Sequence, residues 1–284
     1  FLSFYMLFLI LIILYGIGII INGVVILVIL TFNKMRKSSM NLLLLNLALS
    51  DLCLLSINSL YLMPKLFERP ILKFSLIYCH FHIFMTGVCG LVSILTYMAI
   101  CVERYIVIIC PLHASNWCTR SRILLVINSI WAFAIMYRLP YFDLIGTEKH
   151  EYGCFLEFLP FHWVSEFAFI HLSVFIISAT LYYKTCKVLW SMEVLDYTRL
   201  NERKIRQRRK VMKVLIFCFV LYFLCSFGSI SLFIICELYG IDILRYAIRL
   251  FAMQSAINPF IYTLIGKQFR QNFTNFFSRI FNHK

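Results

Sequence analysis

The chain has 284 residues, of which 62% are hydrophobic and only 14% are charged, and its mean hydropathy is +0.85. A soluble domain is about half apolar and about a quarter charged. This composition therefore excludes a soluble enzyme, a disordered chain and a collagen-like fibre, and leaves a protein that crosses the membrane several times. The formal net charge of +14 comes from basic residues in short gaps between apolar runs, which indicates membrane topology rather than nucleic-acid binding.

Seven apolar stretches are long enough to cross the roughly 30 Å of hydrocarbon as helices. We expect an all-α protein, a seven-transmembrane helix bundle in a single domain over residues 1–284. The expected spans are 3–32, 39–64, 76–110, 121–140, 162–192, 203–236 and 242–265. Phenylalanines then recur at helical spacing within residues 267–281, which predicts an amphipathic helix on the inner leaflet.

The charge of the gaps between the spans predicts the orientation. The first, third and fifth gaps and the C-terminal tail are basic, whereas the gap over residues 141–163 is acidic. Because basic gaps stay in the cytoplasm, we expect the N-terminus outside and the C-terminus inside. The predicted location is the plasma membrane, with the lipid bilayer as a partner and no nucleic acid.

Short motifs occur in a fixed order along the spans. They are Asn22 in span one, Asp51 in span two, Glu103-Arg104-Tyr105 with Pro111-Leu112 after span three, Trp131 in span four, and Asn258-Pro259-Phe260-Ile261-Tyr262 in span seven. This set resembles the class A (rhodopsin-like) G protein-coupled receptors over essentially the whole chain. The cytoplasmic half looks opsin- or melatonin-receptor-like, and the subfamily stays unresolved.

The resemblance implies a receptor that turns binding of an extracellular ligand into activation of a heterotrimeric G protein, with arrestin as a further inner partner. It assigns coupling and activation to the residues Glu103, Arg104, Tyr105, Pro111, Leu112, Asn258, Pro259 and Tyr262. Physical chemistry agrees for Arg104, because a cation at the inner end of a helix is costly unless it is paired or wetted. Glu103 is its neighbour and can hold it.

Asp51 is the one carboxylate deep inside a span, and a charge there is a functional-site hypothesis by default. The resemblance places Ser93 and Asn258 as its polar partners and implies a sodium ion or waters between them. A protonated Asp51 in a polar network is the alternative. We expect no other cofactor and no enzyme, since the chain shows no nucleophile with its base, no phosphate loop and no zinc-ligand set.

The chain also departs from the family pattern. Ser226 and Gly228 stand in span six where tryptophan and proline are usual, and Arg206–Lys210 stands where many members carry an acidic partner for the span-three arginine. We therefore expect weak restraint of the inactive state and appreciable basal activity, with loss of signalling as the alternative. The resemblance also implies a disulfide between Cys79 and Cys154.

The ligand stays unknown, a small molecule or a peptide. Thr86 stands where aminergic receptors carry aspartate, and Ala252 stands where opsins carry the retinal lysine. This argues against an Asp-anchored amine and against Schiff-base retinal. The candidate ligand-binding residues of the outer half are His82, Met85, Thr86, Glu166, Arg245 and Arg249. The basic members can hold a carboxylate or phosphate, and the acidic second outer loop can attract a basic peptide.

Two other functions remain open at this point. A non-signalling scaffold or decoy receptor fits the missing tryptophan and proline of span six. A small transporter fits the number of spans, but it needs polar residues at the bilayer midplane of several spans. Asp51 alone is a carboxylate at such a depth.

Overall fold

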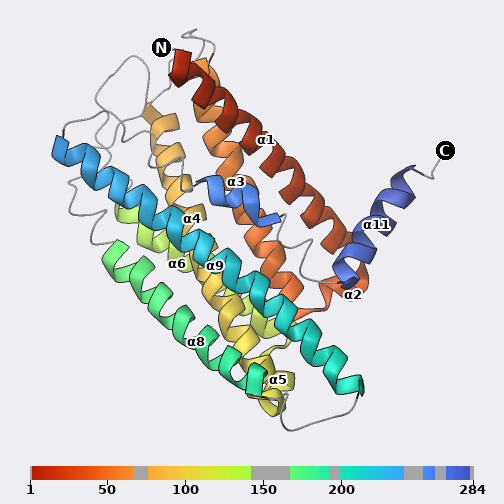
Figure 1. Ribbon diagram of the computed structural model, residues 1–284. Helices are drawn as coiled ribbons and strands as arrows, with labels where there is room; N and C mark the ends of the chain where they lie inside the picture. The colour runs from red at the N-terminus through yellow and green to blue at the C-terminus, as the bar shows by residue number, and fades with distance from the viewer. Residues whose placement is uncertain are drawn as a thin grey trace.

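The computed structural model describes residues 2–66, 76–141, 167–191, 199–239, 252–259 and 267–281. Six helices in these ranges are long and apolar enough to cross a membrane, and they lie side by side in a bundle (Figure 1). They are α1 (Leu2–Thr31), α3 (Ser39–Leu66), α4 (Leu76–Ile109), α6 (Arg120–Arg138), α8 (Leu172–Ser191) and α9 (Arg199–Tyr239). Their ends lie close to the expected spans.

The fifth and seventh expected spans differ in how much of them is described. A π-helical turn, η2 (Phe167–His171), leads directly into α8, so the inner part of the fifth span is one helical unit. Residues 252–259 are helical and fall inside the expected seventh span. The rest of that span lies outside the described residues.

Short helices gather where the long ones end. Figure 1 shows α2 (Asn33–Arg36) and the start of α11 (Lys267–Phe281) together at one end of the bundle, with α5 (Pro111–Trp117) at that end too. The sequence did not predict α5, although Pro111 occupies its first turn, a position where the missing N–H costs nothing. Phe273 and Phe276 of α11 pack against the main core.

The two central helices are α3 and α4. In the most apolar window of each, 61% of α3 and 56% of α4 is buried, against 17% of α6. Helix α3 packs against α1, α4 and α6, and α4 packs against α6 and α8. The exposed apolar residues of the outer helices, such as Ile20, Leu125 and Met136, are the surface that lipid covers, because lipid tails are as apolar as these side chains.

Helix α1 approaches α3 and segment 252–259 closely at Gly18. A β-carbon built there lies 2.7 Å from Leu55 Cδ1 and 2.8 Å from Ala256 Cα, so a side chain does not fit. One turn further, the Asn22 amide donates to the carbonyl of Gly18 at 2.9 Å and to that of Ser255 at 3.1 Å. Small residues such as Gly18 let helix backbones come close together in a membrane.

We expect Gly18→Val to lower the melting temperature of the detergent-solubilised protein by several degrees. Overpacking typically costs about 1–3 kcal/mol, and here the clash includes backbone. Gly16→Val is the control, since no atom lies within 4 Å of a β-carbon at Gly16. Equal melting temperatures for the two variants would contradict the close approach.

Candidate functional site

The buried centre of the bundle is a hydrogen-bonded network around Asp51. Its Oδ1 accepts a hydrogen bond from Ser255 Oγ at 2.7 Å and one from Ser93 Oγ at 3.2 Å, and its Oδ2 accepts one from Asn258 Nδ2 at 2.7 Å. The Asp51 side chain is fully buried, with 0% exposed. A buried carboxylate needs such donors because it has lost its hydration. The network therefore joins α3, α4 and segment 252–259.

Tyr97 extends this network toward α9. Its hydroxyl donates to Asn258 Oδ1, and its ring lies 5.2 Å from the ring of Tyr222, at an interplanar angle of 54°. The Tyr222 ring also faces His171, with 6.4 Å between the ring centres. A polar contact at one end of Tyr97 and an aromatic contact at its side thus connect Asp51 to α8 and α9.

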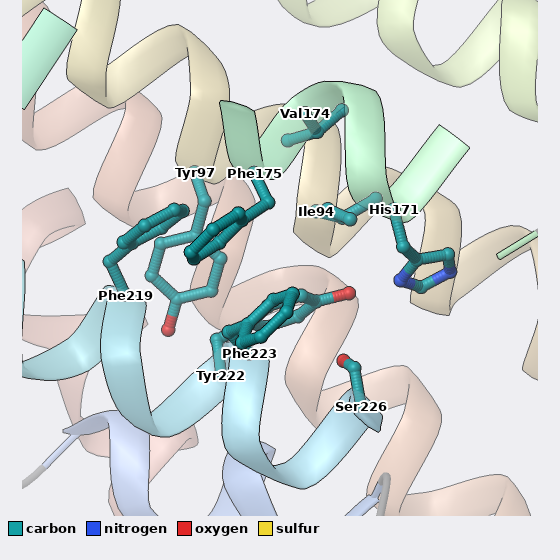
Figure 2. A pocket seen from close by; sticks show the side chains of 9 residues that line it. All are labelled: Ile94, Tyr97, His171, Val174, Phe175, Phe219, Tyr222, Phe223 and Ser226. Carbon is teal, nitrogen blue, oxygen red and sulfur yellow. The ribbon is translucent and has the colours of Figure 1, made fainter. Parts of the chain in front are cut away.

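A small cavity lies between α4, α8 and α9 next to these aromatic rings (Figure 2). It is lined by Ile94, Tyr97, His171, Val174, Phe175, Phe219, Tyr222, Phe223 and Ser226. Figure 2 shows the hydroxyl groups of Tyr222 and Ser226 and the ring of His171 directed toward one region. The volume of about 10 Å³ has room for about one water molecule.

At the inner end of α4, Arg104 is held by its neighbour Glu103. The Arg104 guanidinium donates to the Glu103 carboxylate from Nε at 2.5 Å and from Nη2 at 2.8 Å. Ser39 of α3 donates to the same carboxylate at 2.6 Å. Glu103 is 2% exposed and Arg104 is 19% exposed, so the carboxylate is buried while the cation borders the inner face.

Helix α5 follows the inner end of α4 and packs against it. Its first residue, Pro111, is exposed, and Leu112 is 87% exposed. Tyr105 of α4 is half-buried. Leu112 and the partly exposed Arg104 are thus both accessible at the inner end of the bundle.

A second polar chain fixes α6 to the centre. Trp131 Nε1 donates to Asn46 Oδ1 at 2.8 Å, and Asn46 Nδ2 donates to Thr96 Oγ1 at 2.8 Å. These residues come from α6, α3 and α4. Every hydrogen-bonding group of such a chain is satisfied without water, which is what a lipid-facing helix requires.

Comparisons with known proteins agree with this architecture. Residues 21–262 match the family described as 7 transmembrane receptor (rhodopsin family). The chain belongs to this family. It is 30% identical to neuropeptide receptor 15 of Caenorhabditis elegans, over 92% of this chain and 86% of that protein. It is 27% identical to galanin receptor 2a of Danio rerio, over 94% and 77% of the two chains.

A third relative is growth hormone secretagogue receptor type 1 of Homo sapiens, 30% identical over 90% of this chain and 76% of that protein. The membership confirms three predictions from the sequence: a rhodopsin-like receptor, a seven-helix bundle and a protein that is not an enzyme. The chain is an integral membrane protein that signals through a G protein in response to an extracellular ligand.

The receptor structure brings Asp51, Ser93 and Asn258 together, as the sequence predicted. Ser255 and Tyr97 also bond into this network, and neither was predicted from the sequence. A helical repeat provides the signal for Ser255, because it precedes Asn258 by three residues and so shares its face. Tyr97 follows Ser93 by four residues in α4 and could have been found in the same way.

The outer half of the receptor is partly described. His82 is buried between Tyr61 and Tyr78, with ring distances of 4.5 Å and 6.3 Å, so it is held in an aromatic cluster. Met85 packs against the second hydrophobic cluster, and Thr86 Oγ1 has no hydrogen-bond partner among the described residues. The other predicted ligand residues, Glu166, Arg245 and Arg249, lie outside the described residues.

Four further predicted residues have separate outcomes. Cys79 is disulfide-bonded, while Cys154 lies outside the described residues, so their pairing stays a prediction. Pro259 is buried at the end of segment 252–259. Tyr262 lies outside the described part of the chain.

Arg138 is a basic residue of the outer half that the sequence analysis did not single out. It is the last residue of α6, and its side chain reaches α4. A β-carbon built on Gly87 lies 2.8 Å from Arg138 Nε and 2.9 Å from Cζ. The signal in the sequence was a cation at the end of an apolar span.

We expect Tyr97→Phe to lower the melting temperature of the receptor, because it leaves the Asn258 carbonyl oxygen buried without its donor. Such a loss costs about 1–3 kcal/mol, while the ring contact with Tyr222 is kept. Tyr183→Phe is the control, since Tyr183 is 68% exposed. If both variants melt at the wild-type temperature, the Tyr97 hydrogen bond has no energetic role.

Proposed function

We propose that this receptor lies in the plasma membrane and responds to an extracellular peptide. The relatives support a peptide, since one is named for a neuropeptide and the others for galanin and a growth hormone secretagogue. The acidic gap over residues 141–163 favours a basic peptide, because opposite charge steers association. Thr86 offers no carboxylate to anchor an amine.

The observation that carries the mechanism is the buried network from Asp51 through Asn258 to Tyr97, with its ring contact to Tyr222. A ligand in the outer half shifts the receptor between two conformations only if it binds one of them more tightly. Packed networks are bistable rather than continuously deformable. When a ligand binds one conformation more tightly, this network therefore moves α9 to a new position relative to α4.

The output is proposed to pass through Arg104. In the active conformation the guanidinium leaves Glu103 and contacts the G protein, together with Tyr105, Leu112 and Tyr262. Arrestin is proposed to bind the same inner face, because the exposed Leu112 and the exposed cation Arg206 of α9 border it.

A sodium ion is proposed at Asp51. The chemistry of the site fits, because the Asp51 carboxylate and the hydroxyls of Ser93 and Ser255 are the oxygen ligands that hard cations prefer. No Lys or Arg side chain hydrogen-bonds to Asp51 in the described part of the chain. A bound cation would compensate the buried charge.

We expect Arg104→Ala to abolish receptor-dependent nucleotide exchange on a G protein in membranes, both without ligand and with a panel of synthetic neuropeptides. The reason is that the alanine variant offers no cation to the G protein. Arg120→Ala, at the exposed start of α6, is the control and should match the wild type. Both variants are compared at equal surface expression.

The exchange assay tests the peptide ligand and the signalling activity separately. If small molecules raise nucleotide exchange and no peptide does, the proposal of a peptide ligand is contradicted. Surface receptor that never stimulates exchange with any ligand would favour a scaffold or decoy.

We expect sodium chloride to raise the melting temperature of the wild-type receptor above its value in potassium chloride of equal concentration, because a ligand stabilises the state that binds it. Asp51→Asn should abolish this difference. Ser93→Ala keeps the carboxylate and should reduce the difference without removing it. An equal sodium effect in wild type and Asp51→Asn would show that sodium acts elsewhere.

A further inference from the structure

The side chain of Arg209 in α9 is hydrogen-bonded to the inner end of α8. The last carbonyls of a helix have no partner within that helix, and two of those at the end of α8 accept hydrogen bonds from this guanidinium. Arg209 Nε and Nη2 donate to the Leu189 carbonyl at 3.1 Å and 3.0 Å, and Nη2 donates to the Trp190 carbonyl at 3.3 Å.

The same guanidinium lies over an aromatic ring. Arg209 Cζ is 5.4 Å from the centre of the Trp190 ring, a distance that gives cation–π attraction. Arg209 is half-buried, whereas its neighbours Arg206, Arg208 and Lys210 are exposed. Of these four cations, Arg209 is thus the one turned toward α8, at the helix end where a positive charge is favoured.

Aromatic contacts continue the α8–α9 interface from this point into the membrane. The Phe175 ring stacks on Phe219 at 5.3 Å and on Phe223 at 3.9 Å, and Tyr182 meets Phe219 edge-on at 5.5 Å. Arg209 is therefore the polar end of a long interface. Leu189, whose carbonyl it binds, is fully buried.

Helix α8 is in turn held against α4. The two helices pack together, and Cys101 Sγ donates to the Ser178 carbonyl at 3.4 Å. Arg104 of α4 pairs with Glu103 on its own helix, and Arg206–Lys210 offers it only like charge and a neutral Gln207. Among the described residues, polar contacts therefore link the inner end of α9 to α4 through α8, and not through Arg104.

We propose that Arg209 is a positioning residue that restrains the inner end of α9 in the inactive receptor. Breaking its contacts with α8 lets α9 move away from α4 and opens the inner face to the G protein. This rests on G-protein signalling, which family membership establishes, and it is independent of the peptide and of the sodium ion.

The test compares basal nucleotide exchange in membranes for the wild type, Arg209→Ala, Arg209→Lys and Arg208→Ala at equal surface expression. Arg208→Ala removes the same charge from the adjacent exposed position. We expect Arg209→Ala to raise basal exchange about threefold or more, since hydrogen bonds from a charged group are among the stronger ones, and Arg208→Ala to leave it unchanged. Arg209→Lys keeps the charge without the planar fork and should lie between the two.

A conformational measurement separates a restraint from a stability effect. Spin labels at the exposed positions Ser191 and Lys210 report the separation of the two inner ends. We expect a wider distance distribution for Arg209→Ala than for Arg208→Ala. Equal basal exchange in the two alanine variants, or an unchanged distribution, overturns the proposal.

Two further outcomes of the exchange assay also test the Arg209 proposal. If both alanine variants lose nucleotide exchange to the same extent, the proposal is overturned. Such a result would mean that the basic stretch contacts the G protein directly. If Arg209→Ala fails to reach the surface, Arg209→Lys decides, and basal exchange at the wild-type level then overturns the proposal. If the wild-type receptor gives no more exchange than membranes without receptor, G-protein coupling itself has failed. That result is distinct from one in which only the Arg209 variants fail to behave as expected.

Discussion

A carboxylate in the middle of a membrane has to be compensated from inside the protein, and much of this bundle is arranged around Asp51. Three donors reach it from α4 and segment 252–259, while α3 supplies the carboxylate itself. Asn22 of α1 binds the carbonyl of Ser255, so a fourth helix is fixed to the same point. Because each unmatched polar group in lipid costs several kcal/mol, sliding any of these helices along the others is penalised.

The contacts divide the receptor into two sets of helices. Asp51, Asn46 and Glu103 link α3, α4 and α6 through hydrogen bonds, whereas aromatic stacking and Arg209 link α8 and α9. Tyr97 belongs to both sets, since its hydroxyl bonds Asn258 and its ring meets Tyr222. Stacked rings tolerate sliding better than directional hydrogen bonds do. Relative motion is therefore expected at the aromatic interface and not at the polar one.

The residues that could be predicted from the sequence are those that differ in polarity from the apolar spans around them. Asp51, Arg104 and Glu103 are conspicuous because charge is rare in apolar spans, and the family pattern then supplied Ser93 and Asn258. Ser255 and Tyr97 were missed because serine and tyrosine are ordinary in membrane helices. Arg209 sits in a run of like charges, where no pattern separates the half-buried cation from the exposed ones; only the geometry of α8 does. The weak restraint of α9 that the missing acidic partner predicts stays a prediction, and Arg209 is our proposal for a different restraint.

The contact between Gly87 and Arg138 constrains how this receptor can diverge. The guanidinium occupies the space that a β-carbon on Gly87 would fill, so the position of a positive charge in the outer half depends on a residue without a side chain. Alanine at 87 would displace the flexible end of Arg138, while a smaller residue at 138 would leave a void beside Gly87. The two positions are expected to covary among descendants of this receptor, because a change at either one alters the space that the guanidinium occupies.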